Sequence, residues 1–354
     1  MGAPSTVLLT GASTGIGLAV ARRLLDTTEH RLILTARESS LERFGAAGIA
    51  EGPRVRLRAL DVTHPDERVE VVREAERDWG GVDVLINNAG VSYRAVVEHV
   101  RDRERLAQMQ VNFLAPMELI RLVLPSMRAK RGGRILSVSS VGGMMAMPTM
   151  AIYSASKFAL EGAHEALWYE VRPWGIHVSL IEPGFINSEG FRHVRYTPSS
   201  ESAERTSDDA YHAHYRFMGA FVMRLMDRTH STPESVAKVI VRTMHKKHPS
   251  LRVPATFDAW LFVMLRRLLP RWVYHRVLYA GLPGIRRWGP ERAGPMPALP
   301  PSSVPPEPPR GPAPDAPDAP EAFTEPPGAP EAPWRSDDDR PGRRPTRADE
   351  PGAP

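Results

Sequence analysis

A tyrosine and a lysine stand four residues apart, at Tyr153 and Lys157, with Ser140 and Asn112 upstream of them. Residues at this spacing lie on one face of a helix, so we expect the phenol and the ammonium to be neighbours. A free tyrosine has a pKa near ~10, and a nearby positive charge lowers that pKa by favouring the phenolate. Such a phenol can exchange a proton with an alcohol or ketone oxygen, which Ser140 could hold in place. These residues therefore predict proton transfer at a hydroxyl or carbonyl group.

A glycine-rich loop near the start of the chain predicts a second kind of site. The apolar run 5–10 is typical of a buried parallel strand, and residues 18–25 have helical periodicity. Between them, residues 11–17 carry glycines spaced Gly-x-x-x-Gly-x-Gly. Glycines let the backbone approach a pyrophosphate, which the positive end of the following helix attracts. The loop therefore indicates a dinucleotide site.

The glycine spacing and the Tyr/Lys pair together resemble the short-chain dehydrogenase/reductase family. Further motifs stand in the family's order: Asp61-Val62, Asn87-Asn88-Ala89-Gly90, the strand that ends at Ser140, and Pro183-Gly184. The resemblance covers about residues 5–255, and the stretches after Ser140 and Tyr153 look most like the 17β-hydroxysteroid and retinol dehydrogenase branch.

The resemblance implies a role for each residue of the site. Tyr153 would be the general acid/base and Ser140 would position the substrate oxygen. Lys157 would lower the tyrosine pKa and hold the cofactor ribose, while Asn112 would support a water relay behind Lys157. The family usually has threonine a few residues after Pro-Gly, where this chain has Ser188. The cofactor-binding residues implied are Gly11, Ser13, Thr14, Gly15, Ile16, Gly17, Arg37, Asp61, Val62, Asn88, Ala89, Gly90, Tyr153, Lys157, Pro183, Gly184, Ile186 and Ser188.

The end of the second predicted strand favours NADP(H) over NAD. An acidic residue about twenty residues after the glycine loop would bind the ribose 2′-hydroxyl of NAD, whereas arginine accommodates the 2′-phosphate of NADP. The strand 31–36 is followed by Arg37, and no acid stands at its tip. Arg37 is therefore predicted to pair with the phosphate.

Strand and helix patterns alternate along residues 1–256, which predicts one α/β domain of the Rossmann type. We expect a doubly wound parallel sheet of seven strands in the order 3-2-1-4-5-6-7, with strands near 5–10, 31–36, 54–60, 83–87, 133–139, 175–182 and 250–254. Helices are expected at about 101–129 and 152–171. An amphipathic helical extension should follow at 257–288, broken at Pro270. Of the 35 prolines, 21 lie in residues 290–354, so 289–354 is predicted to be a disordered tail.

The substrate is expected to be bulky and apolar. The stretch between Gly184 and Thr232 has no strand pattern but many aromatic residues and methionines, and Met144, Met145, Met147 and Met150 follow Ser140. The sequence therefore predicts an NADP(H)-dependent oxidoreductase acting on a steroid-, retinoid- or aryl-ketone-like alcohol or carbonyl. Two alternatives stay open: a 3-oxoacyl reductase of fatty-acid or polyketide type, and a catalytically idle NADP-sensing scaffold.

Composition limits the partners. The chain has no cysteine, so thiolate catalysis is excluded, and its histidines show no metal-ligand pattern. The sequence has no compact basic cluster of the kind that binds nucleic acid, and no apolar run reaches the ~20 residues that a membrane-spanning helix needs. The first predicted strand begins at Ser5, so we expect no signal peptide and a cytoplasmic protein. The family resemblance also implies a homo-oligomer, either a dimer or a tetramer. Residues 257–280 mix aromatic residues with arginine, which is typical of a helix lying in a membrane interface, a pocket lid or an oligomer contact.

Overall fold

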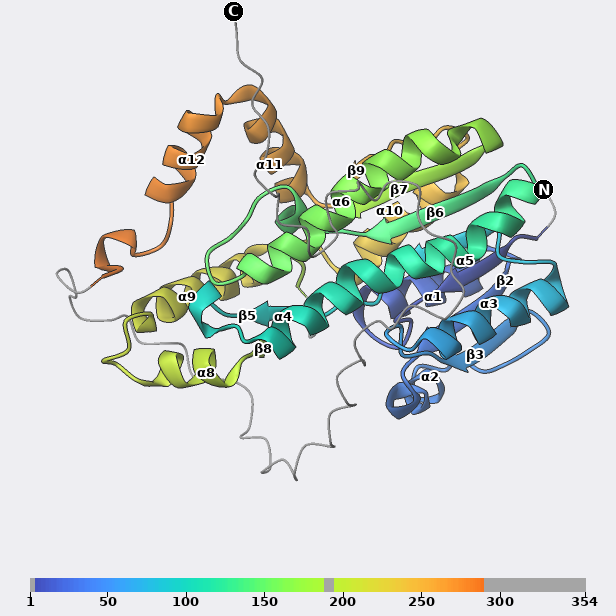
Figure 1. The fold of residues 1–354 in the computed structure, drawn as a ribbon, viewed down its shortest axis with the longest axis horizontal. Helices are drawn as coiled ribbons and strands as arrows, with labels where there is room; N and C mark the ends of the chain where they lie inside the picture. The colour runs from blue at the N-terminus through green and yellow to red at the C-terminus, as the bar shows by residue number, and fades with distance from the viewer. Residues whose placement is uncertain (1–3, 188–193, 290–354) are drawn as a thin grey trace, which may run out of the picture. The chain divides into compact units, whose positions relative to one another are not determined.

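The computed structural model describes residues 4–187 and 194–289. Seven parallel strands form its main sheet, in the order β3-β2-β1-β4-β6-β7-β9 (Figure 1). Numbered within this sheet alone, that is 3-2-1-4-5-6-7, so the predicted topology is confirmed. The strands are β1 Thr6–Leu9, β2 Arg31–Ala36, β3 Val55–Ala59, β4 Val84–Asn87, β6 Gly133–Val138, β7 Ile176–Glu182 and β9 Arg252–Pro254.

Two layers of helices bury the two faces of the sheet. Alternate residues of a strand point to opposite faces, so Val7 and Leu9 of β1 pack toward α1 and α10, whereas Leu8 packs toward α3, α5 and α6. Because both faces are covered, the central strands β1 and β4 are mainly apolar, whereas the edge strand β3 carries two arginines. The helices of these layers are α1 Gly15–Thr27, α2 Glu42–Ala46, α3 Pro65–Trp79, α5 Ala115–Ala129, α6 Ala151–Val171 and α10 Pro233–His245.

The parallel register brings the sequence motifs to one edge of the sheet. Leu8 of β1 is level with Ile33 of β2 and with Leu85 of β4, so the carboxyl ends of these strands lie together. The glycine loop follows β1, Arg37 follows β2 and Asn88 follows β4. Ligands of doubly wound sheets bind at this edge. Short 3₁₀ turns complete the connections, at Glu38–Ser40, Val97–His99, Val141–Gly143, Arg172–Trp174 and Ile285–Arg287.

Two local features differ from the sequence expectation. The helix predicted at about 101–129 is α4 (Asp102–Met109) joined to α5 through a π-helical turn, Gln110–Leu114. A short strand, β8 (Arg195–Tyr196), lies in the stretch expected to lack strands and pairs with β5 (Tyr93–Arg94). Two residues are too few to show the alternation of apolar and polar side chains that predicts a strand, so the sequence predicts neither β5 nor β8. Helices α8 (Pro198–Arg205) and α9 (His212–Arg228) follow.

The C-terminal extension forms two helices, as predicted. Helix α11 runs over Phe257–Leu268 and α12 over Arg271–Ala280, with Pro270 between them (Figure 1). Proline lacks the amide hydrogen that a continuous helix needs at this position. Within the described ranges, no helix has the length and hydropathy needed to cross a membrane. Ser188 and residues 290–354 of the predicted tail lie outside those ranges. The predicted domain boundaries stay predictions.

Candidate active site

The glycine loop leaves β1 and enters α1 in a conformation that needs glycine. Gly11 and Gly15 have positive φ angles of 66° and 54°, which side chains rarely adopt. A Cβ on Gly17 would lie 2.1 Å from the carbonyl oxygen of Gly11, so the first turn of α1 folds directly against the loop. The backbone is therefore open toward solvent at the start of α1, where the amide groups of a helix attract phosphate.

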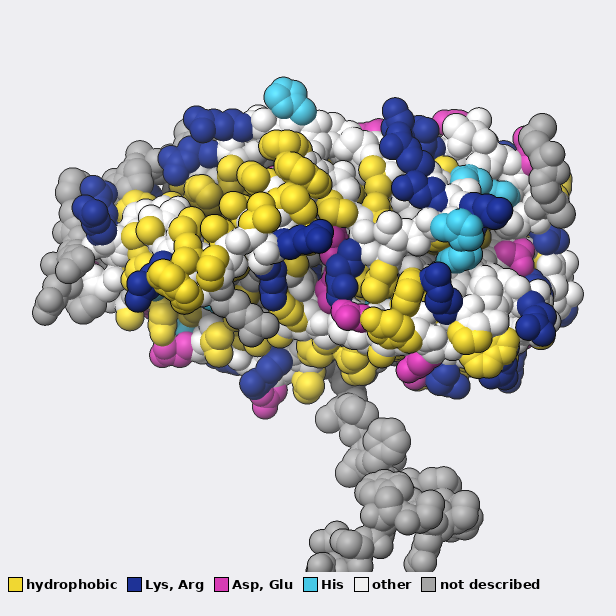
Figure 2. Space-filling view, turned by 90° about the horizontal axis from the view of Figure 1, so that it is seen from above, with side chains coloured by type: hydrophobic (Ala, Val, Ile, Leu, Met, Phe, Trp, Pro, Cys, Tyr) yellow, Lys and Arg dark blue, Asp and Glu magenta, His cyan; other side chains and the backbone are white. Residues whose placement is uncertain are grey.

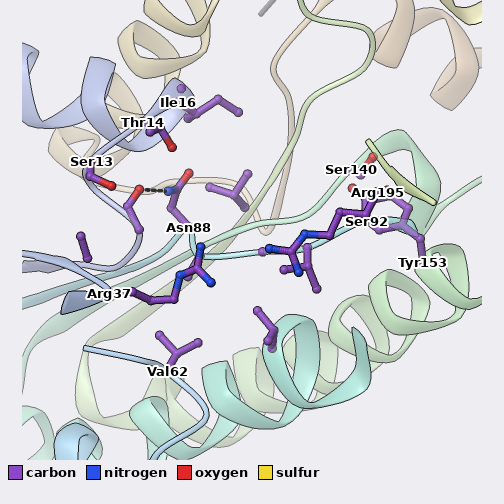
Figure 3. Close-up of a pocket in the computed structure, with 18 of the residues that line it drawn as sticks. Ser13, Thr14, Ile16, Arg37, Val62, Asn88, Ser92, Ser140, Tyr153 and Arg195 are labelled. Carbon is purple, nitrogen blue, oxygen red and sulfur yellow. Dashed lines mark hydrogen bonds between the residues drawn. The ribbon is translucent and has the colours of Figure 1, made fainter. Parts of the chain in front are cut away.

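The loop is fixed to the end of β4 by a small hydrogen-bond network. The hydroxyl of Thr10 accepts from the backbone N–H groups of Asn88 and Ala89, at 3.0 and 3.1 Å. The Asn88 side chain donates in return to the carbonyl oxygens of Thr10 and Gly11, both at 3.0 Å. Figure 3 draws one hydrogen bond from this side chain. The two loops therefore form one rigid wall.

A cavity of about 600 Å³ opens at the carboxyl edge of the sheet and gathers most of the predicted site (Figure 3). Its walls come from the loops after β1, β2, β3, β4, β6 and β7 and from the start of α6. Fifteen of the residues predicted from the sequence line it: Gly11, Ser13, Thr14, Gly15, Ile16, Arg37, Asp61, Val62, Asn88, Ala89, Gly90, Ser140, Tyr153, Lys157 and Pro183.

Four other predicted residues lie elsewhere. Gly17 supports the loop from beneath. Gly184 lines a small neighbouring pocket that also reaches Ser140 and Tyr153. Ile186 is fully buried in the core between the sheet and α10, and does not face the cavity. Asn112 lies behind Gly90 and not in the wall.

Ser140, Tyr153 and Lys157 converge at one end of the cavity. Ser140 follows β6 in an extended conformation, and its hydroxyl accepts from the N–H of Gly142 at 3.0 Å. Tyr153 and Lys157 lie on successive turns of α6, with the lysine nitrogen 5.9 Å from the centre of the phenol ring. The ammonium is buried and donates to the carbonyl oxygen of Val138 at 2.9 Å. The predicted juxtaposition of these three side chains is therefore present.

The sequence predicted that Lys157 lowers the pKa of Tyr153, but in the protein without cofactor this pKa is raised. Burial raises the pKa of the phenol, and the interaction with the Ser140 hydroxyl opposes the rise. Burial also lowers the pKa of Lys157 to about 8, against the attraction of Glu161. Removing the phenolate charge from bulk water is unfavourable, and this penalty outweighs the opposing interaction with Ser140. Tyr153 is thus held as a neutral phenol, the form that can give up a proton.

Asn112 lies in the π-helical turn and ties down the loop after β4. Its side-chain oxygen accepts from the N–H of Val91 at 2.9 Å, and its nitrogen donates to the Val91 carbonyl at 2.8 Å. The same nitrogen donates to the hydroxyl of Ser156 on α6 at 3.0 Å. Asn112 therefore links the π turn, the Gly90 loop and the helix that carries Tyr153 and Lys157. A π turn often marks a functional site.

The opposite end of the cavity is positively charged. Arg37 follows β2, is exposed, and extends into the cavity in Figure 3. Arg43 of α2 lines the same end, together with Ser40. The sequence predicted only the first of these arginines, because strand and loop spacing marks the tip of β2 but not the helix after it. Two cations near a hydroxyl suit a phosphate group.

The cavity has further lining residues that sequence reasoning missed. Arg195 extends from β8 into the cavity, and its guanidinium lies 5.9 Å from the centre of the Tyr93 ring (Figure 3). Ser92 and Val194 lie beside them. No spacing relates β5 to β8, so only the fold brings these residues together.

The wall beside Ser140 and Tyr153 is mainly apolar, although Arg94 also lines it. Met147, Met150, Phe185 and Val222 line the small pocket there. Of the aromatic residues expected at the substrate side, Phe185 and Phe221 pack in this cluster, whereas Tyr215 is fully buried with its hydroxyl bonded to the N–H of Val96. Met147 and Met150 lie where the sequence expects the methionines after the serine to face the substrate.

Comparison with known proteins gives a consistent set of relatives. A family model described as short chain dehydrogenase matches residues 5–198. A 3-ketodihydrosphingosine reductase of Bacteroides thetaiotaomicron is 34% identical over 70% of this chain and 87% of its own length. The 17-beta-hydroxysteroid dehydrogenase type 1 of Homo sapiens is 32% identical over 71% of this chain and 77% of its own. A solved metagenomic short-chain oxidoreductase in complex with NADP is 26% identical, with a TM-score of 0.53, and the match covers 71% of this chain and 96% of that one.

We predict that Gly17→Ala disrupts the loop. The new methyl group would collide with the Gly11 carbonyl and the Asn88 side chain. The carbonyl is part of the backbone and the asparagine is hydrogen-bonded to it, so neither group can move aside freely. Overpacking of this kind costs about 1–3 kcal/mol, or a fall in Tm of about 5 °C for a domain of this size. Gly162→Ala is the matched control, because a Cβ at that helical position meets nothing within 4 Å. Thermal unfolding curves that coincide for the two variants would contradict the prediction.

Proposed function

Because the chain belongs to the short-chain dehydrogenase/reductase family, we propose that it interconverts a bulky apolar alcohol and its ketone or aldehyde with NADP(H). Membership of the family makes it an oxidoreductase that acts on CH–OH groups and uses a nicotinamide cofactor. The observation that carries the proposal is the convergence of Ser140, Tyr153 and Lys157 at one end of the cavity, with the glycine loop along the same cavity.

The residues present fit a dinucleotide. Gly17 leaves no room for a Cβ against Gly11, and the loop keeps its backbone open at the start of α1. The residues proposed to hold the cofactor are those of the loop, Asn88 to Gly90, Lys157 and the arginine end of the cavity. When bound, a nicotinamide supplies or accepts the hydride at the substrate carbon.

The proton side of the reaction falls to Tyr153. The neutral phenol gives its proton to the carbonyl oxygen during reduction, and the Ser140 hydroxyl donates a hydrogen bond that orients that oxygen. Lys157 places a positive charge one helical turn away and stabilises the phenolate that forms. Asn112 bonds both the backbone of Val91 and the hydroxyl of Ser156 on α6, and so keeps the position of the helix fixed relative to the Gly90 loop.

The preference for NADP(H) is supported by charge. Arg37 and Arg43 line the end of the cavity after β2, whereas Glu38, the residue after Arg37, does not line the cavity. A guanidinium pairs with a phosphate through two parallel hydrogen bonds, whereas the ribose hydroxyl of NAD would ordinarily be met by a carboxylate.

The apolar wall supports a lipophilic substrate. Methionine and aromatic side chains face Ser140 and Tyr153, and two relatives are named for sphingoid and steroid substrates. A wall of flexible methionine side chains adapts to a bulky apolar substrate more readily than a wall of rigid polar side chains does.

The two C-terminal helices support a peripheral contact with an anionic bilayer. Phe257, Trp260 and Trp272 are 75%, 49% and 64% exposed, and Figure 2 shows hydrophobic side chains gathered on this side of the molecule with Lys and Arg side chains among and around them. Residues 257–288 hold six arginines and one acidic residue. Arg276 lies 5.3 Å from the Trp272 ring, so cation and aromatic ring are presented together. This mixture fits lipid headgroups above acyl chains. The homo-oligomer, the cytoplasmic location and the disordered tail stay predictions.

Replacing Tyr153 by phenylalanine tests the chemistry. Tyr153→Phe keeps the ring but removes the proton donor, so we expect kcat to fall by about 10²–10⁴ while the Kd for NADPH stays the same. Tyr169→Phe is the control, because that tyrosine lies on the same helix and is exposed. Turnover within tenfold of wild type in Tyr153→Phe would rule out Tyr153 as the acid.

Reversing the charge of Arg37 tests the cofactor preference. We expect Arg37→Asp to raise the Kd for NADPH by about 10-fold or more and to leave the Kd for NADH unchanged, since only the former has the 2′-phosphate. Arg73→Asp on the exposed side of α3 controls for the overall change of charge. Equal affinity of the wild-type protein for both cofactors would refute the preference.

Sedimentation with vesicles tests the bilayer contact. The full chain should sediment with phosphatidylglycerol vesicles at low salt, less at high salt, and not with phosphatidylcholine vesicles. The double variant Trp260→Ala/Trp272→Ala should lose most of this binding. Trp174→Ala, a partly exposed tryptophan in the turn after α6, should retain it. If the wild-type protein stays in the supernatant with every vesicle, or if it forms a dimer that the double variant breaks, the surface serves another purpose.

A further inference from the structure

A line of charged groups continues from Lys157 along α6, away from the cavity. Lys157, Glu161 and Glu165 follow one another at intervals of four residues and so lie on the same face of the helix. Lys157 and Glu161 are buried, whereas the side chain of Glu165 is about half exposed. The proposed reaction uses the lysine and leaves the two carboxylates below it without a role.

Arg252 of β9 closes this line from the side of the sheet. Its Nε lies 2.9 Å from a carboxylate oxygen of Glu161 and 3.9 Å from one of Glu182, the last residue of β7. Its terminal nitrogen lies 2.7 Å from Glu165. The buried carboxylates of Glu161 and Glu182 therefore face the same guanidinium nitrogen, whose side chain is partly exposed.

The surroundings of Glu182 are unfavourable for a charged carboxylate. It is 1% exposed, and neither of its oxygens has a hydrogen-bond partner among the residues that the structure describes. One oxygen of Glu161 also lacks a partner within the same ranges. Burial and the like charge of Glu161 raise the pKa of Glu182 to about 8. Burial also raises the pKa of Glu161, and the interactions with Ser139 and Arg252 oppose that rise. Two buried carboxylates that share one cation cannot both ionise readily.

We propose that Glu161 and Glu182 hold a single proton between them at neutral pH, and that the one negative charge left on the pair keeps Lys157 in its ammonium form. Both glutamates are positioning residues, because they act through Lys157. This inference rests on the proposed role of the lysine in the reaction.

The other groups around the pair and the lysine supply no competing charge. His164 on α6 is buried, which lowers its pKa to about 4, so it is neutral at neutral pH. Tyr153 is a neutral phenol, and β6 presents the Val138 carbonyl and the Ser139 hydroxyl. From the π turn, Asn112 presents an uncharged amide near Gly90. The guanidinium of Arg252 is shared among Glu161, Glu165 and Glu182, and Glu161 is the acidic side chain whose charge acts on Lys157.

The proton on the pair gives stability a particular dependence on pH. Glu182 binds its proton more tightly in the folded protein than at its ordinary pKa of 4.5, which applies once the chain unfolds. Its contribution to stability is therefore full below about pH 4.5 and is lost as pH rises to about 8. Glutamine resembles the protonated acid and does not titrate. Glu182→Gln should thus match the Tm of wild type near pH 5 and exceed it by roughly 5–10 °C near pH 8.5.

The sharing itself is tested in a second background. Without the charge of Glu161, Glu182 should ionise more easily, so in Glu161→Gln protein the gain from Glu182→Gln should start at the same pH but level off about one pH unit lower and at a smaller value. If that gain has the same pH dependence in both backgrounds, or no pH dependence in either, the shared proton is refuted. These Tm measurements need no turnover, so they stand even if the proposed reaction fails.

The effect on Lys157 is read from the pH profile of kcat/KM. In Glu161→Gln the lysine loses the charge that holds its proton, so the alkaline fall in activity should begin about one pH unit lower than in wild type. Glu165→Gln is the matched control: it faces the same arginine from the next turn of α6 and should leave the profile unchanged. An alkaline limb that coincides in wild type and Glu161→Gln, or moves equally in both variants, would overturn the role of the pair.

Discussion

One buried positive charge constrains the architecture of this protein. The Lys157 ammonium lies out of water and must be compensated by groups whose positions are fixed. The carbonyl of Val138 at the end of β6 accepts from it, and Glu161 lies one turn further along α6. Helix α6 therefore cannot rotate or slide on the sheet without separating the ammonium from its acceptor. The phenol one turn before the lysine and the serine after β6 inherit the same fixed geometry.

The sequence was sufficient where local pattern and chemistry coincide. Buried strands such as Val84–Asn87 are mainly apolar, and the residues that follow them are brought together at one edge of the sheet. The glycine loop is similarly legible, because the approach of Gly17 to Gly11 admits no other residue. Pro270 marks the break between α11 and α12 by covalent structure alone.

Other features depend on long-range packing and left no local trace. Strands β5 and β8 are two residues each and meet only because the chain returns over a hundred residues later. The direction of the Tyr153 pKa depends on how completely water is excluded, which a spacing of four residues does not record. Glu161 and Glu182 read as ordinary helix and strand residues, and only the fold places both against Arg252. Such groups are set by tertiary contact, so a single sequence could not have revealed them.

The start of α11 shows that the helical extension is joined to the catalytic body and not merely appended to it. The N–H of Gly184 donates to the Thr256 hydroxyl at 2.9 Å, and the N–H of Phe185 donates to the Asp258 carboxylate at 2.8 Å. A Cβ on Gly184 would coincide with that carboxylate, so helix and turn are moulded to each other. Cutting the chain just after the last strand would strip two backbone donors beside the active site of their acceptors. The smallest fragment able to work alone must therefore run past Asp258.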